Sequence, residues 1–282
     1  MSDHLEAGRT REQDKTRVRS IFLSDIHLGT RGCQAELLTS FLKAHSAERV
    51  YLVGDIIDGW RLKKSLYWPQ AHNDVLRRLF TLMKRGTEVI YVTGNHDEFL
   101  RKYDDMVLGN LSMVDQAEHE TADGKRLLVL HGDQFDVITR YARWVALLGD
   151  AGYIALMQIN RLFNTVRKRF GFGYFSLSAW VKQRVKRAVN FVSEFESSVA
   201  KECRREGYDG VVCGHIHHAE ITDIQGVRYM NCGDWVESCT ALVEDHDGTF
   251  RIVHWRDELA NAPLSTQATV PEAKPVLPAR AA

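Results

Sequence analysis

Residues 20–27 read SIFLSDIH, an apolar run that leads directly into two potential metal ligands, Asp25 and His27. The pattern recurs four times: VYLVG precedes Asp55, VIYVTG precedes Asn95, LLVL precedes His131, and GVVCG precedes His215 and His217. Each run is short, apolar and bounded by a turn, which predicts a buried β-strand. In open α/β sheets, ligands bind outside the carboxyl ends of the strands. We therefore expect two Asp, one Asn and four His at one rim of one sheet.

The regions between and after these blocks predict an α/β core with a helical insertion. The segments that alternate are strand-like at 18–24, 49–53, 88–93 and 127–131, and helical at about 33–46 and 70–85. This alternation predicts parallel strands with right-handed crossovers. The strand pattern resumes at 210–213, 227–231, 238–244 and 250–255, where turn residues predict an antiparallel meander.

Composition shifts divide the chain into five predicted parts. These are a disordered arm at 1–17, a first core segment at 18–134, a helical insertion or lid at 135–205, a second core segment at 206–258, and a disordered tail at 259–282. The tail contains four of the five prolines and no hydrophobic periodicity, so it should not bury enough apolar surface to fold.

The overall composition excludes few classes of function, but it indicates the cellular compartment. The chain has 282 residues, 44% of them hydrophobic, and a formal net charge of zero, so bulk charge favours no partner. No apolar run approaches the roughly 18–20 residues of a membrane span, and the polar N-terminus lacks the core of a secretory signal. Five cysteines, an odd number without CxxC spacing, favour free thiols in a reducing cytosol. We expect a cytoplasmic protein.

The ligand types at the predicted rim favour a site for two metal ions. On an extended chain, residues two apart face the same way, so Asp25 and His27 could share one divalent ion. The two oxygens of Asp55 could bridge two ions, and Asn95 adds a neutral oxygen. Nitrogen and oxygen ligands without thiolate favour Mn²⁺, Fe, Co or Zn²⁺, and we expect Mn²⁺. The neighbouring glycines, Gly54, Gly94, Gly132 and Gly214, should allow tight turns and a close approach of the backbone.

The blocks DIH, GDIID, GNHD, HGD and GHIH, in this order over residues 25–217, resemble the five-block motif of the calcineurin-like metallophosphoesterases. A single histidine at a strand end is more often a hydrogen-bonded turn residue than a ligand. Seven residues of ligand type at five successive strand ends, however, would require repeated coincidence if they were not ligands. The resemblance implies an α/β/β/α sandwich of two mixed sheets. It also implies two ligand sets that share Asp55: Asp25, His27, Asp55 and His217 for one ion, and Asp55, Asn95, His131 and His215 for the other.

The resemblance also implies a mechanism. Two ions would activate a bridging water as hydroxide and clamp the phosphoryl oxygens for in-line attack. His96, the residue of GNHD that is not a ligand in the family, would stabilise the transition state or protonate the leaving oxygen. Asp97 could orient His96 or cap a helix. Asp58 could lie behind the ligands or touch the substrate.

The composition of the predicted insertion indicates the class of substrate. Residues 151–193 contain eight basic residues and no acidic ones, interleaved with eight aromatic residues. This composition favours an anionic amphiphile or membrane surface, with Lys182 and Lys186 as candidate phosphate contacts. A solvated basic face over an ordinary core and a groove for single-stranded nucleic acid are the alternatives. The zero net charge argues against a nuclease.

A metallophosphoesterase core with a helical insertion between HGD and GHIH is similar to the UDP-2,3-diacylglucosamine pyrophosphatases of lipid A synthesis, over about residues 18–256. That similarity implies cleavage of UDP-2,3-diacylglucosamine to UMP and 2,3-diacylglucosamine 1-phosphate at the cytoplasmic face of the inner membrane. The chain has GNHD where those enzymes have GNRD, which leaves open a phosphodiesterase for another nucleotide, a phospholipid or a nucleic acid. A non-catalytic binding module is disfavoured because all seven ligands and His96 are present. The insertion could be a lipid lid, a membrane foot or a dimer interface, and the oligomeric state stays open.

Overall fold

The computed structural model describes residues 15–135 and 192–261. The chain divides into two compact units, one formed by residues 1–133 with 200–282 and the other by 134–199. Most of the predicted insertion, with Lys182 and Lys186, lies outside the described residues, as do most of the predicted arm and tail. Every residue of the metal centre described below belongs to the first unit.

A mixed sheet of seven strands forms the first sheet of this unit, in the order β12-β11-β1-β2-β3-β5-β4. Its strands are β1 (Thr16–Leu23), β2 (His45–Val53), β3 (Glu88–Val92), β4 (Met106–Leu108), β5 (Leu111–Val114), β11 (Thr240–Glu244) and β12 (Phe250–His254). The strands β1, β2, β3 and β5 run parallel, as the alternation predicted for the first three, and β4, β11 and β12 are antiparallel additions. β1 begins at Thr16, inside the predicted arm, because Thr16 and Arg17 pair with the start of β2.

A mixed sheet of five strands forms the second sheet, in the order β6-β7-β8-β10-β9. Its strands are β6 (Gln116–Glu120), β7 (Arg126–Leu130), β8 (Gly210–Cys213), β9 (Glu220–Ile224) and β10 (Val227–Asn231). The predicted antiparallel meander is wrong here. β10 pairs in parallel with β8 and forms a hairpin with β9, whereas β11 and β12 form a hairpin in the first sheet. Turn residues mark where the chain reverses, but not which sheet the next strand joins.

The described helices of this unit include α2 (Ala35–Ala44), α3 (Gly59–Lys64), α4 (Gln70–Lys84), α7 (Trp255–Asn261) and the 3₁₀ helix η1 (Glu98–Tyr103). A further 3₁₀ turn, η2, spans Asp133–Phe135. Trp255, predicted as the end of a strand, starts α7, and α7 ends inside the predicted tail. In α4 the buried residues His72, Val75, Leu79 and Leu82 recur every three or four positions, which forms one apolar stripe of a helix.

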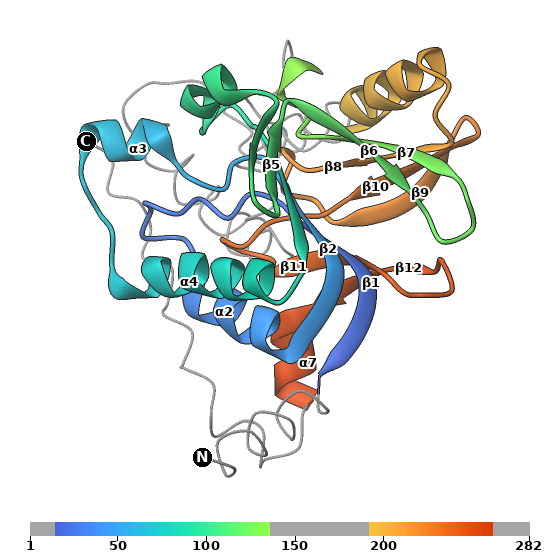
Figure 1. Ribbon diagram of the computed structural model, residues 1–282. Coiled ribbons are helices and arrows are strands. Elements are labelled where there is room, and N and C mark those ends of the chain that lie inside the picture. Colours follow the sequence, from blue (N-terminus) through green and yellow to red (C-terminus); the bar gives the residue numbers. More distant parts are fainter. Residues whose placement is uncertain (1–14, 136–191, 262–282) are drawn as a thin grey trace, which may run out of the picture. The chain divides into compact units, whose positions relative to one another are not determined.

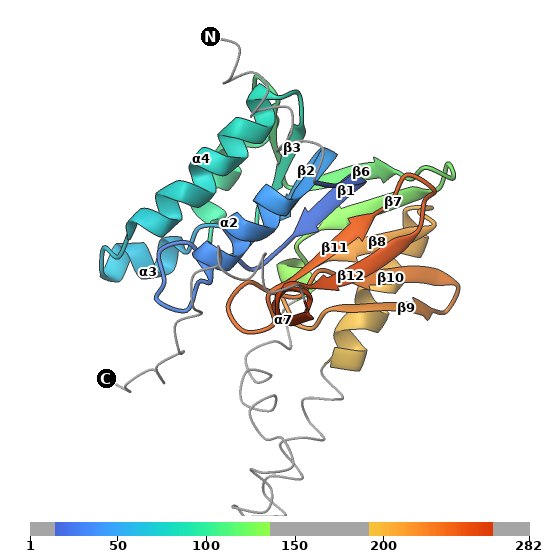
Figure 2. The ribbon, with the colours of Figure 1, turned by 90° about the horizontal axis from the view of Figure 1, so that it is seen from below.

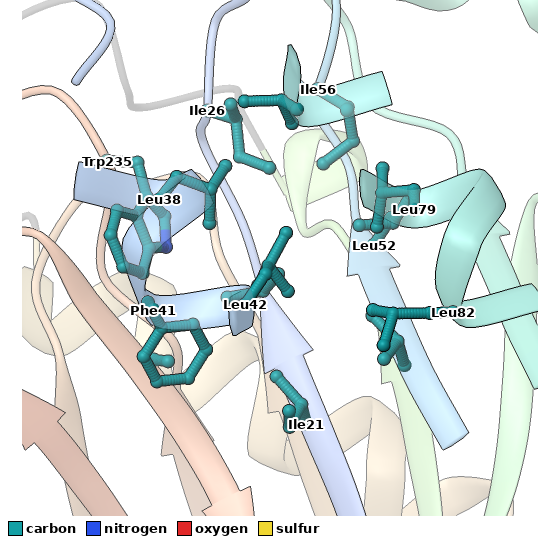
Figure 3. Close-up of a cluster of buried hydrophobic side chains, with 14 of the residues drawn as sticks. Ile21, Ile26, Leu38, Phe41, Leu42, Leu52, Ile56, Leu79, Leu82 and Trp235 are labelled. Carbon is teal, nitrogen blue, oxygen red and sulfur yellow. The ribbon is translucent and has the colours of Figure 1, made fainter. Parts of the chain in front are cut away.

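The two sheets and the helices form successive layers. α2, α4 and α7 lie on one face of the first sheet, and the second sheet stacks against its other face (Figures 1 and 2). Leu38 and Leu42 of α2 pack with Leu82 of α4 against Ile21 and Leu52 of the sheet (Figure 3).

The alternate residues of the same strands form a separate cluster between the sheets. There Phe22 and Val53 of the first sheet meet Val129 and Val212 of the second. Both faces of β1 and β2 are therefore buried, which explains why these strands read as continuous apolar runs. The predicted α/β fold with two mixed sheets is confirmed.

All five cysteines lie in the described residues and are free thiols, as predicted, and Cys213 and Cys232 are buried in the core. Among the described helices, none has the length and apolar character to cross a bilayer.

Candidate metal centre

The seven predicted ligands lie where strands of both sheets end. Asp25 and His27 follow β1, Asp55 follows β2 and Asn95 follows β3, all in the first sheet. His131 follows β7, and His215 and His217 follow β8, in the second sheet. The expectation of one rim of one sheet is therefore wrong. Stacking of the sheets brings together two rims that the local sequence pattern cannot distinguish.

The backbone at the ligands is left-handed rather than extended. Five of them have positive φ angles: Asp25 (51°), His27 (54°), Asp55 (56°), His215 (72°) and His217 (56°). Asp25 and His27 therefore do not have the extended backbone from which their common orientation was predicted. A left-handed non-glycine residue costs about 1–3 kcal/mol and persists where surrounding structure imposes it, most often at functional sites.

The side chains form three overlapping groups of potential ligands: one around Asp25, one around His131, and one that joins His27, Asp55 and His96 between them. In the first, Asp25 Oδ1 lies 3.0 Å from His217 Nε2 and 3.7 Å from His27 Nε2. In the second, His131 Nε2 lies 3.4 Å from Asp55 Oδ1 and 3.2 Å from His215 Nδ1. The other oxygen of Asp55 lies 3.9 Å from His27 Nε2, so this carboxylate stands between the groups. The groups around Asp25 and His131 fall within the two ligand sets that the family resemblance implied, and the assignment of ligands to ions stays a prediction.

Buried polar atoms without partners test whether this site fits metal ions. Among the described residues, Asp25 Oδ1, His27 Nε2 and Asn95 Oδ1 are buried and have no hydrogen-bond partner. Leaving such atoms unsatisfied is costly, and native proteins rarely do so without a functional reason. A divalent ion would use these atoms as ligands, and the set of nitrogen and oxygen donors fits Mn²⁺, Fe, Co or Zn²⁺.

The electrostatics of the site favour bound positive charge. Burial raises the pKa of Asp55, but the charge and hydrogen bond of His131 outweigh burial and lower this pKa to about 2. Burial lowers the pKa of His131, but Asp55 outweighs it and raises this pKa to about 10. For His27, contacts with Asp25 and Asp58 outweigh burial and raise the pKa to about 9. Protons and metal ions therefore compete for the same nitrogens.

Contacts behind the ligands orient them. His131 Nδ1 lies 2.9 Å from the carbonyl oxygen of Val53, which can only accept a hydrogen bond, so Nε2 is left to face Asp55. Asp25 Oδ2 accepts hydrogen bonds from Ser24 Oγ at 2.5 Å and from the backbone N–H of His215 at 2.8 Å. That leaves Oδ1 of this carboxylate to face His217 Nε2 and His27 Nε2.

The glycines beside the ligands allow the close approach that the sequence predicted. A Cβ at Gly94 would collide with the Asp55 carboxylate, and a Cβ at Gly214 would collide with Ser24. Any larger residue at either position would displace a side chain of the metal centre.

Asp58 contacts two imidazoles of the site. Its Oδ1 lies 3.1 Å from His96 Nδ1, and its Oδ2 lies 3.4 Å from His27 Nδ1. The same side chain caps α3 by accepting a hydrogen bond from the backbone N–H of Arg61 at 2.8 Å. Asp58 thus lies behind His27 and His96, and a contact with the substrate stays a prediction. The capping pattern was readable from the sequence, but the contacts with histidines of two other loops were not.

The side chain of Asp97 joins two loops and, among the described residues, makes no hydrogen bond to the ring of His96 or to the first turn of η1. It accepts hydrogen bonds from Gly94 N at 2.6 Å, Ile56 N at 2.8 Å and Tyr91 Oη at 2.6 Å. It precedes η1 but makes no side-chain capping bond there. Both contacts expected for Asp97 are thus corrected: burial and three donors tie it to the loops that carry Asp55 and Asn95. A catalytic role for Asp97 stays a prediction.

The ring of His96 lies at the surface side of the centre. Its Nε2 is 3.9 Å from Asp55 Oδ2, and its ring stands edge-on to that of His27, with 4.7 Å between centroids. On its other side lies the indole of Trp60, at 4.2 Å between centroids. The sequence did not indicate Trp60 as part of this surrounding.

Comparison with known proteins identifies the family of this chain. Residues 18–219 match the calcineurin-like phosphoesterase family. Two curated relatives are named UDP-2,3-diacylglucosamine hydrolase. The one from Neisseria meningitidis serogroup C is 24% identical over 250 residues, covering 80% of this chain and 94% of its own. The one from Pseudomonas paraeruginosa is 26% identical over 247 residues, covering 81% and 95%. A solved hypothetical protein from Pyrococcus horikoshii is 10% identical and aligns with a TM-score of 0.47, covering 89% of this chain and 96% of its own.

Proposed function

The chain belongs to the calcineurin-like phosphoesterases and is a metal-dependent hydrolase, and we propose that it cleaves UDP-2,3-diacylglucosamine to UMP and 2,3-diacylglucosamine 1-phosphate. The proposed substrate rests on the similarity, over about four fifths of the chain, to relatives that are named for this molecule. The paired groups of Asp and His between the sheets support the hydrolytic chemistry.

We assign the seven ligands to two divalent ions, with Mn²⁺ as the expected metal. Asp25, His27 and His217 would hold one ion and His131, His215 and Asn95 the other, while Asp55 lies between them. When bound, two such ions polarise phosphoryl oxygens and lower the pKa of water, which supplies the nucleophile at neutral pH. The protein contributes the orientation of the ligands and the pairing of their outer atoms.

His96 is the residue that we expect to act on the substrate directly. Asp58 contacts its Nδ1, so Nε2 is the nitrogen presented to the phosphoryl group. The lipid 1-phosphate that leaves is a weak base and needs little protonation. We therefore assign to His96 the stabilisation of charge that develops on the phosphoryl oxygens, more than proton donation.

The identity of residue 96 also supports a second candidate function. The pyrophosphatases that this chain resembles carry Arg at this place, and this chain carries His96. A shorter side chain with a single facing nitrogen would serve a different diester, such as another nucleotide or a phospholipid. The core of the site would be the same in both cases.

The test is hydrolysis of UDP-2,3-diacylglucosamine by the Mn²⁺-loaded protein in mild detergent, with bis-p-nitrophenyl phosphate assayed in parallel. We expect release of UMP that is abolished by Asp55→Ala and retained in Asp123→Ala, a matched change at an exposed carboxylate outside the centre. Cleavage of the chromogenic diester alone would overturn the assigned substrate and leave the hydrolytic site standing. UMP release by Asp55→Ala at the wild-type rate would overturn the site.

A lipid-linked substrate would bring the protein to a membrane surface. The cytoplasmic face of the inner membrane stays our prediction for that surface. Nucleic acid as a partner stays disfavoured by the zero net charge.

A further inference from the structure

A basic and apolar surface is exposed at α3 and the loop that follows it. It is formed by Trp60, Arg61, Lys63, Lys64 and Leu66, here called the α3 surface. Leu66 is 84% exposed and Trp60 is 42% exposed, and the three basic residues are exposed as well. α3 lies at the periphery of the unit, and a loop leads from it to the start of α4 (Figures 1 and 2). An isolated exposed Leu is ordinary, but here it lies among cations next to an exposed indole.

The charge of this surface is of one sign. Residues 59–73, GWRLKKSLYWPQAHN, contain no acidic residue. Arg31, from the loop after β1, places its guanidinium 4.8 Å from the ring centroid of Tyr67 and adds a further cation beside the loop. On the η1 side, Glu98 accepts a hydrogen bond from Trp60 Nε1 at 3.3 Å. Three exposed cations therefore lie within five positions of Leu66 in the chain, Arg31 lies beside Tyr67, and Glu98 borders the surface at Trp60.

The neighbouring rings favour a lipid surface over a nucleic acid. Tyr67 and Trp68 are half-buried and stand edge-on to His72, at 5.8 and 5.3 Å between centroids. Trp68 Nε1 is bonded to Asn73 Oδ1 at 2.9 Å. These rings are held by the fold and do not present free faces on which bases could stack. The most exposed side chain, Leu66, cannot stack at all, whereas it can enter the boundary between headgroups and acyl chains.

We propose that the α3 surface binds an anionic lipid bilayer. Leu66 and the edge of Trp60 enter the headgroup region, and Arg61, Lys63 and Lys64 pair with lipid phosphates. The α3 surface consists of other residues than the basic, aromatic insertion, most of which lies outside the described residues.

The α3 surface is directly connected to the metal centre. Asp58, the N-cap of α3, contacts His96 and His27, and the Trp60 ring lies against that of His96. A bilayer bound at α3 would therefore lie beside the site of hydrolysis. The binding itself requires no substrate, whereas its use for a lipid-linked substrate rests on the proposed function.

The experiment is flotation of the full-length, Mn²⁺-loaded protein with vesicles of phosphatidylcholine, with and without phosphatidylglycerol. We expect binding that requires phosphatidylglycerol and weakens with added salt. The double variant Lys63→Glu/Lys64→Glu should bind at least about tenfold more weakly, since each basic side chain near an anionic surface contributes roughly fivefold. Leu66→Ser should weaken binding severalfold. All three side chains are exposed, so the thermal unfolding midpoint should not change.

Two matched controls separate this surface from general charge and apolar effects. Lys84→Glu/Arg85→Glu reverses two adjacent exposed charges at the far end of α4, and Val107→Ser removes an aliphatic side chain that is 70% exposed. Both should bind vesicles as the wild type does. Wild-type binding by the Lys63→Glu/Lys64→Glu variant would overturn the proposal, as would absence of binding by the wild type or a preference for a single-stranded oligonucleotide. Because flotation uses no substrate and the UMP assay uses no vesicles, failure of one leaves the other interpretable.

Discussion

Two buried clusters of histidine and carboxylate residues lie between the same two sheets, and they differ in how completely their atoms are paired. One is the metal centre. The other, here called the Glu244 network, consists of Arg19, Ser20, Tyr51, His119 and Glu244. Glu244 Oε1 accepts from Arg19 Nη1 and from the backbone N–H of Ala122, both at 2.8 Å. Its Oε2 accepts from Ser20 Oγ at 2.9 Å and lies 2.9 Å from His119 Nε2, while His119 Nδ1 lies 3.0 Å from Tyr51 Oη.

The metal centre contains the same residue types, but some of their buried atoms are left unpaired. Asp25 Oδ1 and His27 Nε2 are buried without hydrogen-bond partners among the described residues, and five ligands have left-handed backbones. The Glu244 network connects β1 and β11 of the first sheet to β6 of the second and is satisfied within the chain. Complete pairing fits a structural role for the Glu244 network, whereas the unpaired buried atoms fit the ligand role proposed for the metal centre.

The largest loss of metal and activity should follow a change at the Oδ1 atom of Asp25. Asp25→Asn removes the charge at Oδ1, so we expect loss of bound metal and a fall of roughly a thousandfold or more in kcat/KM, since metal activation is worth several kcal/mol. Metal content by elemental analysis and diesterase rates measure this. Metal content equal to that of the wild type would place Asp25 with the structural cluster and break the comparison.

A smaller loss should follow removal of the imidazole that is not a ligand. His96→Ala should retain both ions and lose about 10²- to 10⁴-fold in kcat, the range typical of a positioned acid–base group. Comparing metal content with turnover in one preparation separates this residue from the ligands. A variant that turns over at a nearly normal rate would remove His96 from the chemistry.

Asp58→Asn should lower activity by about 10- to 100-fold, as expected for a residue that orients ligands from behind. Asn is also a good N-cap, so α3 should remain intact and the change isolates the contacts with His27 and His96. Helical content by circular dichroism serves as the control. A combined Asp58→Asn/His96→Ala variant should lose little more than His96→Ala in kcat at saturating metal, and fully additive losses would show that Asp58 acts elsewhere.

Glu244→Gln should show the opposite pattern, with stability lost and chemistry kept. Breaking charged hydrogen bonds in a buried cluster should lower the free energy of unfolding by about 2–3 kcal/mol. Metal content and diesterase rate should stay within about twofold of the wild type, because changes at well-separated sites act independently. Urea unfolding of the two proteins measures the first effect. Loss of metal from this variant would mean that the two clusters are coupled.

The smallest expected effect is a loss of the contribution of Glu244 to stability at acidic pH. Burial raises the pKa of Glu244, but hydrogen bonds from His119, Ala122 and Arg19 outweigh it and lower the pKa to about 2. A carboxylate with a depressed folded-state pKa stabilises fully above its unfolded pKa and loses this contribution as pH falls toward the folded value. The stability difference between wild type and Glu244→Gln should therefore shrink between about pH 4.5 and pH 2. A difference that is constant over this range would show that Glu244 is not ionised in the fold.

Much of the site could be predicted because its residues follow strands directly in the chain. An apolar run that leads into a ligand with a glycine beside it is a local pattern, so Asp55, Asn95 and His131 could be identified together with their strands. The alternation of strands and helices predicted the parallel pairing of β1, β2 and β3 in the same way. The division of ligands between two ions came from family resemblance rather than from spacing.

The sequence by itself determined which residues end the strands, because hydrophobic periodicity and turn residues are properties of a few neighbouring positions. Only the tertiary structure decided that these strands form two stacked sheets, that Asp97 joins two loops, and that Asp58 lies behind His96. It also decided that Glu244 meets His119, which is 125 positions away in the chain. Such contacts depend on which faces pack together, and the local pattern that makes a strand does not specify its distant neighbours. The difference between an open ligand site and a satisfied structural cluster is therefore a property of the packed molecule.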